Sequence, residues 1–179
     1  MVVLADGAGG MAGAAEAADA LITAATRWDP RDVLTSKGAD AASGLEEADH
    51  ALARTAHGGQ CTAVVVALDG GRVAGASVGD SVAWMVGDDL VDLTASRHRK
   101  PLVGSGRAIA KSFVGELSGR RVLVASDGLW KYADVSHVRE IATIEDIEES
   151  ATKLVDLARL PGGNLQDDVS IALLALART

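Results

Sequence analysis

The stretch TAVVVALDGGRVAGASVGDSVAWMV, residues 62–86, decides the fold class, because valine-rich runs alternate in it with short glycine turns. The sequence Asp69-Gly70-Gly71 is typical of a hairpin turn between two strands. The chain then pairs back as Arg72–Val78, is interrupted by Gly79-Asp80-Ser81, and resumes as a strand over Val82–Val86. The sequence therefore predicts an antiparallel β meander in the middle of the chain.

On either side of this meander the sequence predicts helices and further strands. Apolar residues recur at helical spacing in three segments, residues 14–28, 45–56 and 147–158. Further strands are expected at residues 2–5, 90–93, 122–125 and 169–176, and the polar segment 94–106 is expected to be a loop. Because the strands are continuous apolar runs, both of their faces should be covered. The pattern favours an α+β fold in which helices pack outside sheets.

The composition is that of a folded domain. A chain of 179 residues is long enough for one domain with one sizeable core. Hydrophobic residues make up 48% of the chain, so it is not disordered, and aromatic residues make up only 3%. The core must therefore be built from Ala, Val, Leu and Ile. We expect residues 1–179 to form a single domain.

The charge and the single cysteine restrict the partners and the compartment. A formal net charge of −8 argues against a nucleic-acid or anionic-membrane surface. Cys61 is the only cysteine, so the chain has no internal disulfide and suits a reducing compartment. The apolar start Met1–Ala5 is too short for a signal peptide, and no apolar run is long enough to span a bilayer. We expect a soluble, cytoplasmic protein with no membrane partner.

Four aspartates lie at an end or a break of a predicted core strand. Asp6 follows an apolar run, Asp127 follows the strand at residues 122–125, Asp167 precedes the last strand, and Asp80 interrupts the meander. Because strand ends from one sheet converge, these carboxylates could meet. A single Asp-Gly pair is more often simply a turn, but carboxylates within about 5 Å repel one another unless a cation compensates. Such hard oxygen ligands suit Mg²⁺ or Mn²⁺.

Five short motifs that carry these aspartates occur in a fixed order along the chain. They are Asp6-Gly7-Ala8-Gly9-Gly10-Met11-Ala12-Gly13, Gly59-Gln60-Cys61-Thr62-Ala63, Val78-Gly79-Asp80-Ser81, Ser126-Asp127-Gly128-Leu129-Trp130 and Asp167-Asp168-Val169-Ser170. Together they resemble the metal-dependent serine/threonine protein phosphatases of the PPM, or type 2C, family. The resemblance implies a four-layer α-β-β-α sandwich, with an antiparallel β-sandwich core flanked by helices.

The resemblance also implies a centre of two Mg²⁺ or Mn²⁺ ions. Asp6 would bridge the two ions and the Gly7 carbonyl would bind one of them. Asp127 and Asp167 would hold the other, and Asp80 with Asp127 could hold a third, weaker ion. A water activated by these metals would attack the phosphorus atom. The resemblance thus assigns metal binding to Asp6, Gly7, Asp80, Asp127 and Asp167, and catalysis to Asp6, Asp127 and Asp167.

The chain also departs from the family pattern. The family normally carries an Arg and a Glu-Asp pair before the first Asp-Gly, whereas only Met1–Ala5 precede Asp6 here. Ala8 stands where some members have a His, and Asp168 replaces the usual Asn. We therefore expect a minimal bacterial type of domain, apparently truncated at the N-terminus, with two unequal metal sites and low activity. An open sheet edge could pair with a second chain to form a dimer.

Other candidate residues have simpler alternatives. The run Arg97-His98-Arg99-Lys100 could dock an acidic or phosphorylated substrate, but we favour a solvated loop. Arg107 and Lys111, one helical turn apart, could grip a phosphate. Cys61 is expected to be a small buried strand residue rather than a nucleophile. Trp130 is expected in the core or at the edge of a pocket.

The resemblance implies hydrolysis of phosphoserine and phosphothreonine on proteins that a cognate Ser/Thr kinase has phosphorylated. An alternative from another class is a catalytically impaired phosphatase-like domain that serves as a binding or regulatory module. A third possibility is a phosphatase that acts on a small phosphorylated metabolite. Metal-dependent turnover of a generic phosphoester separates the first hypothesis from the second.

Overall fold

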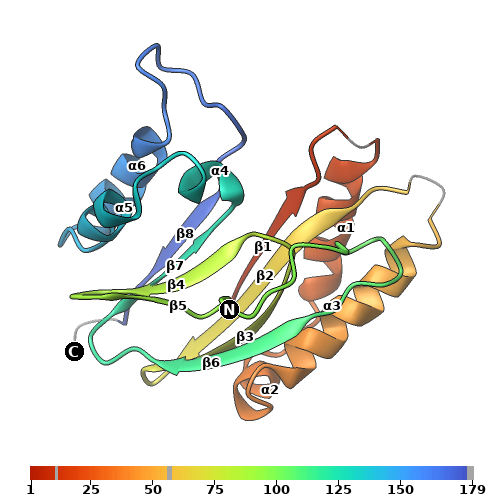
Figure 1. Cartoon of the computed structure of the whole chain (residues 1–179). Helices are drawn as coiled ribbons and strands as arrows, with labels where there is room; N and C mark the ends of the chain where they lie inside the picture. The colour runs from red at the N-terminus through yellow and green to blue at the C-terminus, as the bar shows by residue number, and fades with distance from the viewer. Residues whose placement is uncertain (11, 56–57, 177–179) are drawn as a thin grey trace.

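The computed structural model of the chain describes residues 1–10, 12–55 and 58–176 (Figure 1). Met11 of the glycine-rich motif and Ala56 at the predicted end of the second helix lie outside the described residues.

Two antiparallel four-stranded sheets form the centre of the molecule. The first, sheet A, has the strand order β1-β2-β3-β6, with bounds Val2–Gly7, Cys61–Asp69, Arg72–Val78 and Lys111–Glu116. The second, sheet B, has the order β5-β4-β7-β8, with bounds Leu90–Asp92, Val82–Val86, Arg121–Ala125 and Ile171–Leu174. Each pair of neighbouring strands is antiparallel.

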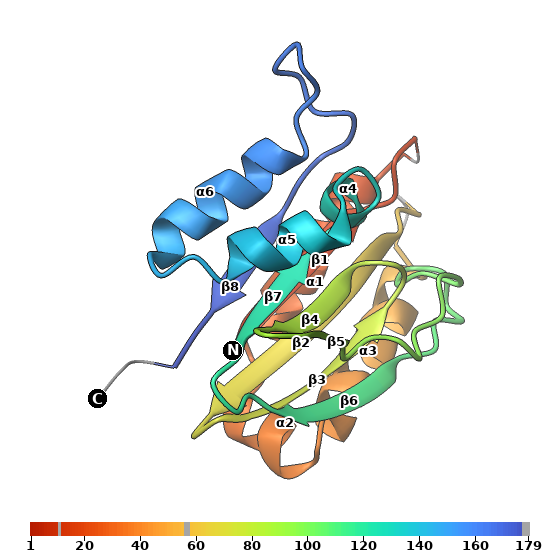
Figure 2. The same cartoon turned by 60° about the vertical axis from the view of Figure 1, so that its left-hand side comes forward.

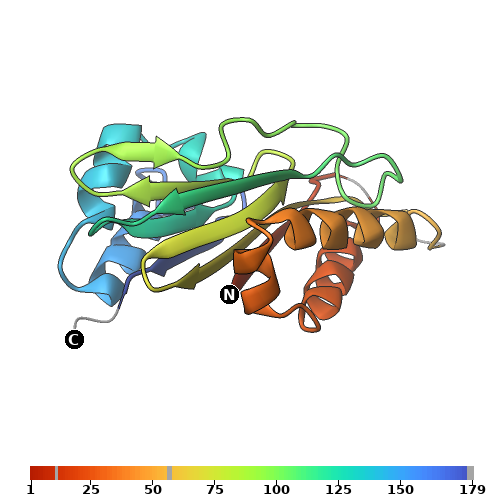
Figure 3. The same cartoon turned by 90° about the horizontal axis from the view of Figure 1, so that it is seen from below.

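Helices cover the outer faces of the two sheets. Over sheet A lie α1, α2 and α3, with bounds Ala14–Ala25, Pro30–Thr35 and Ala39–Leu52. On the side of sheet B lie the short α4 and the longer α5 and α6, with bounds Asp127–Trp130, Val135–Ala142 and Ile147–Leu157. Figures 2 and 3 show the four layers from two further directions. The predicted four-layer α-β-β-α sandwich is confirmed.

The central strands are apolar on both faces because both faces are buried. In β2, Val64 and Val66 point between the sheets, whereas Ala63, Val65 and Ala67 point toward the helices. This alternation follows from the two-residue period of a strand. Ala, Val and Leu side chains make up most of the buried core, as the scarcity of aromatic residues predicts. No helix in the described part of the chain has the length and apolarity needed to cross a membrane.

The structure corrects the predicted meander at one point. Arg72–Val78 and Val82–Val86 are not one interrupted strand, because β3 belongs to sheet A and β4 to sheet B. The chain changes sheet at Gly79, whose φ of +91° disfavours other residues. A Cβ atom there would lie 2.8 Å from Cγ2 of Thr62. Asp80 therefore lies in the bend between the sheets rather than inside a strand.

Several short elements were not predicted, namely α2, α4, α5 and β6. The last strand is also shorter than expected: it covers Ile171–Leu174, whereas residues 169–176 were predicted. The physical reason lies before Ile171: Asp168 and Ser170 form hydrogen bonds with Ser126, two of them with its side chain, and so do not extend the regular strand pairing with β7. Arg107 and Lys111 do not lie on a helix, because Arg107 is in a loop and Lys111 begins β6.

Candidate metal centre

The sequence led us to expect the predicted metal ligands at the strand ends of one sheet. In the structure they come from both sheets. Asp6 lies in β1 opposite Thr62 of β2. Asp80 lies in the bend between β3 and β4, Asp127 is the first residue of α4 after β7, and Asp167 precedes β8. Figure 1 shows the end of β1, the start of β8 and α4 at the same end of the sandwich. The candidate site therefore lies where the two sheets end together.

A buried hydrogen bond connects the Asp6 strand to the Asp80 bend. The hydroxyl groups of Thr62 and Ser81 are 2.6 Å apart, and both side chains are buried. On the other side of the bend, the indole Nε1 of Trp130 donates to the carbonyl oxygen of Asp80 at 3.1 Å. Trp130 is the last residue of α4, which begins with Asp127. The position of Asp80 is thus fixed from β2 on one side and from α4 on the other.

Ser126 attaches the Asp167 segment to Asp127. Its backbone N–H donates to the Ser170 carbonyl at 2.9 Å, and its hydroxyl donates to the Asp168 carbonyl at 3.2 Å. The Ser170 N–H donates back to the Ser126 hydroxyl at 3.0 Å. Gly128 allows this contact, because a Cβ atom at that position would lie 2.2 Å from the Asp168 carbonyl oxygen. The Ser-Asp-Gly motif is therefore also a packing motif.

Glycines of the first two motifs allow the Asp6-Gly7 turn to pack closely. A Cβ atom on Gly7 would lie 2.9 Å from the carbonyl oxygen of Ala14, at the start of α1. A Cβ atom on Gly59 would lie 1.7 Å from the Gly13 carbonyl oxygen. The Ala8 N–H donates to the Gln60 carbonyl at 2.9 Å. These contacts hold the Asp6-Gly7 turn between α1 and the start of β2.

The carboxyl group of Asp6 is affected by the charges of the other acidic residues at the site. Burial, and to a smaller extent the negative charges nearby, raise the pKa of this carboxyl from 3.8 to about 6. In order of decreasing contribution, the charges belong to Asp127, Asp167, Asp168 and Asp80. Asp6 thus interacts with the other three predicted aspartates and with Asp168. A cation beside Asp6 would relieve this repulsion.

Lys131 brings one positive charge to the site. Its ammonium group forms an ion pair with the Asp127 carboxylate, whose side chain is only 14% exposed. This hydrogen bond raises the pKa of Lys131, and the charges of Asp127, Asp80 and Asp167 raise it further. Sequence analysis missed Lys131. The signal was present, because an Asp and a Lys four residues apart on a helix lie side by side.

The predicted ligands have the oxygen donors that a hard divalent cation needs. Their side chains are not arranged around a common point. Within residues 1–10, 12–55 and 58–176, no three Asp, Glu, His or Cys side chains lie close enough together to hold a metal. The available donors are carboxylates and the Gly7 carbonyl, the oxygen ligands that Mg²⁺ and Mn²⁺ prefer. Asp167 is exposed, and Asp127 holds Lys131. A bound metal would require these two side chains to move.

The remaining candidate residues have structural roles or lie at the surface. Cys61 is fully buried, and this burial raises the pKa of its thiol to about 12, so it is no nucleophile. Arg97 is held by Asp92 at 2.8 Å and is not free to dock a substrate. The guanidinium of Arg99 lies 5.6 Å from the centre of the Trp130 ring. Trp130 thus lies at the edge of the site.

Solved structures of bacterial phosphatases share this fold. The serine/threonine phosphatase PstP/Ppp of Mycobacterium tuberculosis is 24% identical, with a TM-score of 0.79 over 98% of this chain and 88% of that chain. Stp1 of Staphylococcus aureus is 20% identical, with a TM-score of 0.77 over 98% of this chain and 83% of that chain. A PstP catalytic domain solved with two manganese ions is 23% identical, with a TM-score of 0.77 over 96% of this chain and 85% of that chain.

No protein-family model matches the chain, and no curated protein matches it. The structural similarity nonetheless extends over nearly the whole described sandwich. The chain therefore has the fold of the bacterial PPM-type serine/threonine phosphatases.

Proposed function

We propose that the protein is a metal-dependent phosphatase that hydrolyses phosphoserine and phosphothreonine on proteins. The observation that carries this proposal is the position of Asp6, half-buried among four other aspartates at one end of a PPM-type sandwich. Burying a carboxylate next to like charges is unfavourable unless a cation compensates. A strained acidic cluster of this kind favours a metal-dependent function over a purely structural one.

In this proposal the aspartates divide between two Mg²⁺ or Mn²⁺ ions. Asp6 and the Gly7 carbonyl would hold one ion, and Asp127 and Asp167, together with Asp6, would hold the other. Asp80 with Asp127 offers a third, weaker site. Bound metals of this type supply a water of lowered pKa and neutralise the oxygens of a phosphoryl group.

The chain's own residues hold this donor set in place. The hydrogen bonds of Ser126 keep the Asp167 segment beside Asp127, and the Thr62–Ser81 bond keeps Asp80 near Asp6. Lys131 forms an ion pair with the Asp127 carboxylate and holds it in place until a cation displaces the ammonium group. Each of these contacts positions an oxygen atom without touching the reacting phosphate.

The second candidate is a phosphatase-like domain that binds or regulates without turnover. The ion pair between Lys131 and Asp127 favours it, because an internal ammonium group can replace a metal as the counter-charge. The unassembled ligand set of the described residues points the same way. We rank this candidate second because a lysine neutralises only one of the five aspartates.

Hydrolysis of para-nitrophenyl phosphate tests the proposal. We expect Mn²⁺-dependent turnover that EDTA abolishes, and we expect Asp127→Ala to reduce kcat by about two orders of magnitude or more. Asp146→Ala, which removes the N-cap of α6 away from the site, is the control and should retain kcat. Undiminished turnover in Asp127→Ala would reject the assignment, and complete absence of turnover would favour the binding module.

The proposal extends to partners and location. The substrates would be phosphoproteins of a cognate Ser/Thr kinase, in the cytoplasm, and residues 1–179 would act as one phosphatase-like domain. We also keep the proposal that an open sheet edge pairs two copies. The edge strands β1 and β8 run side by side, and a groove between them is lined by Val2–Ala5 and residues 170–172. Sedimentation equilibrium measures whether the protein dimerises there.

A further inference from the structure

A cavity of about 460 Å³ lies next to the candidate metal centre, within the size range of ligand pockets. It is formed by the start of β2 and by the loop between β5 and β6. Six residues line it: Gln60, Lys100, Pro101, Leu102, Ser105 and Arg107.

The charge of this cavity is opposite to that of the protein. Lys100 and Arg107 are both exposed, and neither forms an ion pair with any described residue. None of the described residues that line the cavity is acidic, although the chain has a net charge of −8. Two unpaired cations around one cavity favour an anionic ligand.

The cavity adjoins the Asp6-Gly7 turn through a single residue. Gln60 lines the cavity, and its carbonyl oxygen accepts the hydrogen bond from Ala8 N–H at 2.9 Å. On the other flank, the His98 carbonyl accepts a hydrogen bond from Gly79 N–H at 3.1 Å, next to Asp80. A ligand in the cavity would therefore lie beside a phosphate held at the acidic centre.

Hydrogen bonds to Asp49 and Cys61 hold the loop that carries Lys100 and Arg107. The carboxylate of Asp49, which is only 1% exposed, accepts hydrogen bonds from the backbone N–H groups of Gly104, Gly106 and Ala108 at 2.8, 2.9 and 2.9 Å. Val103 also exchanges two backbone bonds with Cys61, at 3.0 and 3.1 Å. Lys100 and Arg107 therefore project from an ordered loop, which lowers the entropic cost of binding.

We infer that this cavity is a subsite for an acidic side chain of the substrate, located a short distance along the peptide from the phosphorylated residue. The inference rests on the proposed phosphatase function and specifies its substrate class, namely phosphoproteins with Asp or Glu close to the phosphoserine or phosphothreonine. Lys100 and Arg107 are specificity residues in this arrangement, because they contact the peptide and not the reacting phosphate.

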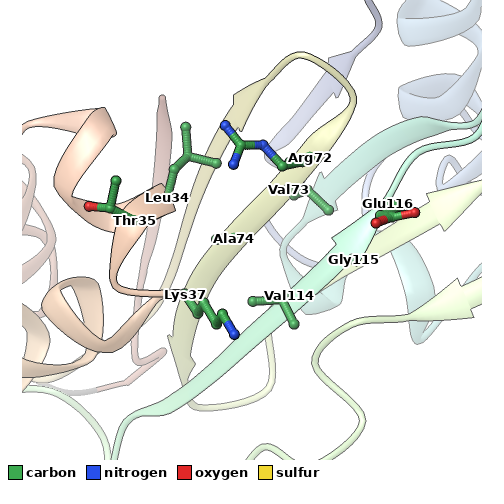
Figure 4. A pocket seen from close by; sticks show the side chains of 9 residues that line it. All are labelled: Leu34, Thr35, Lys37, Arg72, Val73, Ala74, Val114, Gly115 and Glu116. Carbon is green, nitrogen blue, oxygen red and sulfur yellow. The ribbon is translucent and has the colours of Figure 1, made fainter.

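A second cavity at the other end of sheet A provides a matched control. It has a volume of about 500 Å³ and is also bordered by two exposed cations, Lys37 and Arg72 (Figure 4). Glu116 lines it as well, so its charge is mixed. It lies at the β2–β3 hairpin end, away from Asp6.

The test compares two phosphoserine peptides that differ only in having Glu or Ala on either side of the phosphoserine. We expect the wild-type protein with Mn²⁺ to prefer the Glu peptide through a lower KM. Lys100→Gln/Arg107→Gln should lose roughly fivefold in kcat/KM on that peptide, as expected for two solvent-exposed ion pairs. Its turnover of the Ala peptide and of para-nitrophenyl phosphate should not change. Lys37→Gln/Arg72→Gln should behave as wild type on every substrate.

A binding measurement separates the subsite from the catalytic function. Fluorescence anisotropy of a labelled, unphosphorylated Glu peptide in EDTA requires neither metal nor turnover. We expect weaker binding by Lys100→Gln/Arg107→Gln and still weaker binding by Lys100→Glu/Arg107→Glu, with circular dichroism confirming that both variants fold. Loss of binding in a protein without turnover would support the subsite and reject the phosphatase proposal. Turnover without a preference for Glu, or equal binding by all variants, would overturn the subsite.

Discussion

Asp6 shows how far a side chain's chemistry depends on residues distant in sequence. Its position at the end of an apolar run was visible in the sequence, and so was the pattern that placed Asp127 and Asp167 at the ends of other strands. The partner Lys131 was missed, because the i,i+4 spacing from Asp127 indicates a pair only if residues 127–131 are helical, and α4 was not predicted. Residue types at strand ends are thus predictable from sequence, whereas the counter-charge that a fold provides is not.

The raised pKa of Asp6 predicts a pH-dependent stability in EDTA. The folded-state pKa is about 6 and the unfolded value is 3.8, so between these values the folded protein binds more protons than the unfolded chain. The stability of the metal-free protein should therefore fall as the pH rises from about 4 to above 6. Because solvent screens a half-buried carboxylate, we expect a loss of about 1 kcal/mol.

Asp6→Asn should remove this loss and make the metal-free protein more stable at pH 7.5 than the wild type. Urea denaturation in EDTA at pH 4.5 and 7.5 measures both effects. The control is Asp19→Asn, an exposed aspartate on α1, which should retain the wild-type pH dependence. If wild type and Asp6→Asn respond equally to pH, the assignment of Asp6 as the strained carboxylate is wrong.

Lys131 should weaken metal binding, because its ammonium group occupies an oxygen of Asp127 and adds a positive charge beside the ions. Lys131→Met should therefore increase the affinity for Mn²⁺ several-fold, measured by calorimetric titration. Lys153→Met is the matched control, because Lys153 pairs with Glu149 at the same i,i+4 spacing on α6. Weaker binding in Lys131→Met would mean that the lysine supports the metal site instead of competing with it.

At the scale of elements, prediction succeeded where an element had its own hydrophobic pattern. The bounds of β3 and β4 were predicted correctly, because each is a short apolar run between glycine turns. The unpredicted β6 has neither a continuous apolar run nor a regular alternation of polar and apolar residues, and Phe113 is its only buried residue. The crossing from sheet A to sheet B was also missed, because a Gly-Asp-Ser bend has the same sequence whether a strand resumes or changes sheet.

The loop between β5 and β6 depends on one buried carboxylate on α3. Asp49→Ala would leave the N–H groups of Gly104, Gly106 and Ala108 without their acceptor. We expect a loss of about 3 kcal/mol in the free energy of unfolding, since hydrogen bonds to charged groups are worth more than neutral ones. Asp40→Ala, on the exposed face of the same helix, should cost about 0.5 kcal/mol or less. Urea denaturation of the two variants measures the difference, and equal losses would contradict the role given to Asp49.

At the scale of the whole molecule, the candidate metal ligands are distributed over two sheets, and no strand of one sheet pairs with a strand of the other. Asp6 belongs to sheet A, whereas Asp127 and Asp167 flank strands of sheet B. The sequence could not reveal this, because strand order and sheet membership arise from contacts between distant segments. A metal bound by all three residues would therefore connect the two halves of the sandwich as well as neutralise the charge.

This arrangement predicts that Mn²⁺ stabilises the entire fold. Binding to the folded state alone contributes about 2.7 kcal/mol at a hundredfold excess over the dissociation constant. For a chain of this length that corresponds to a rise in melting temperature of roughly 5–10 °C. Because the ligands come from both sheets, Asp6→Asn and Asp167→Asn should each reduce the rise, although they lie on different sheets. Asp88→Asn, in the turn between β4 and β5, should not. Calorimetry in millimolar Mn²⁺ and in EDTA measures these shifts, and a melting temperature that is the same in both solutions would rule out the shared metal centre.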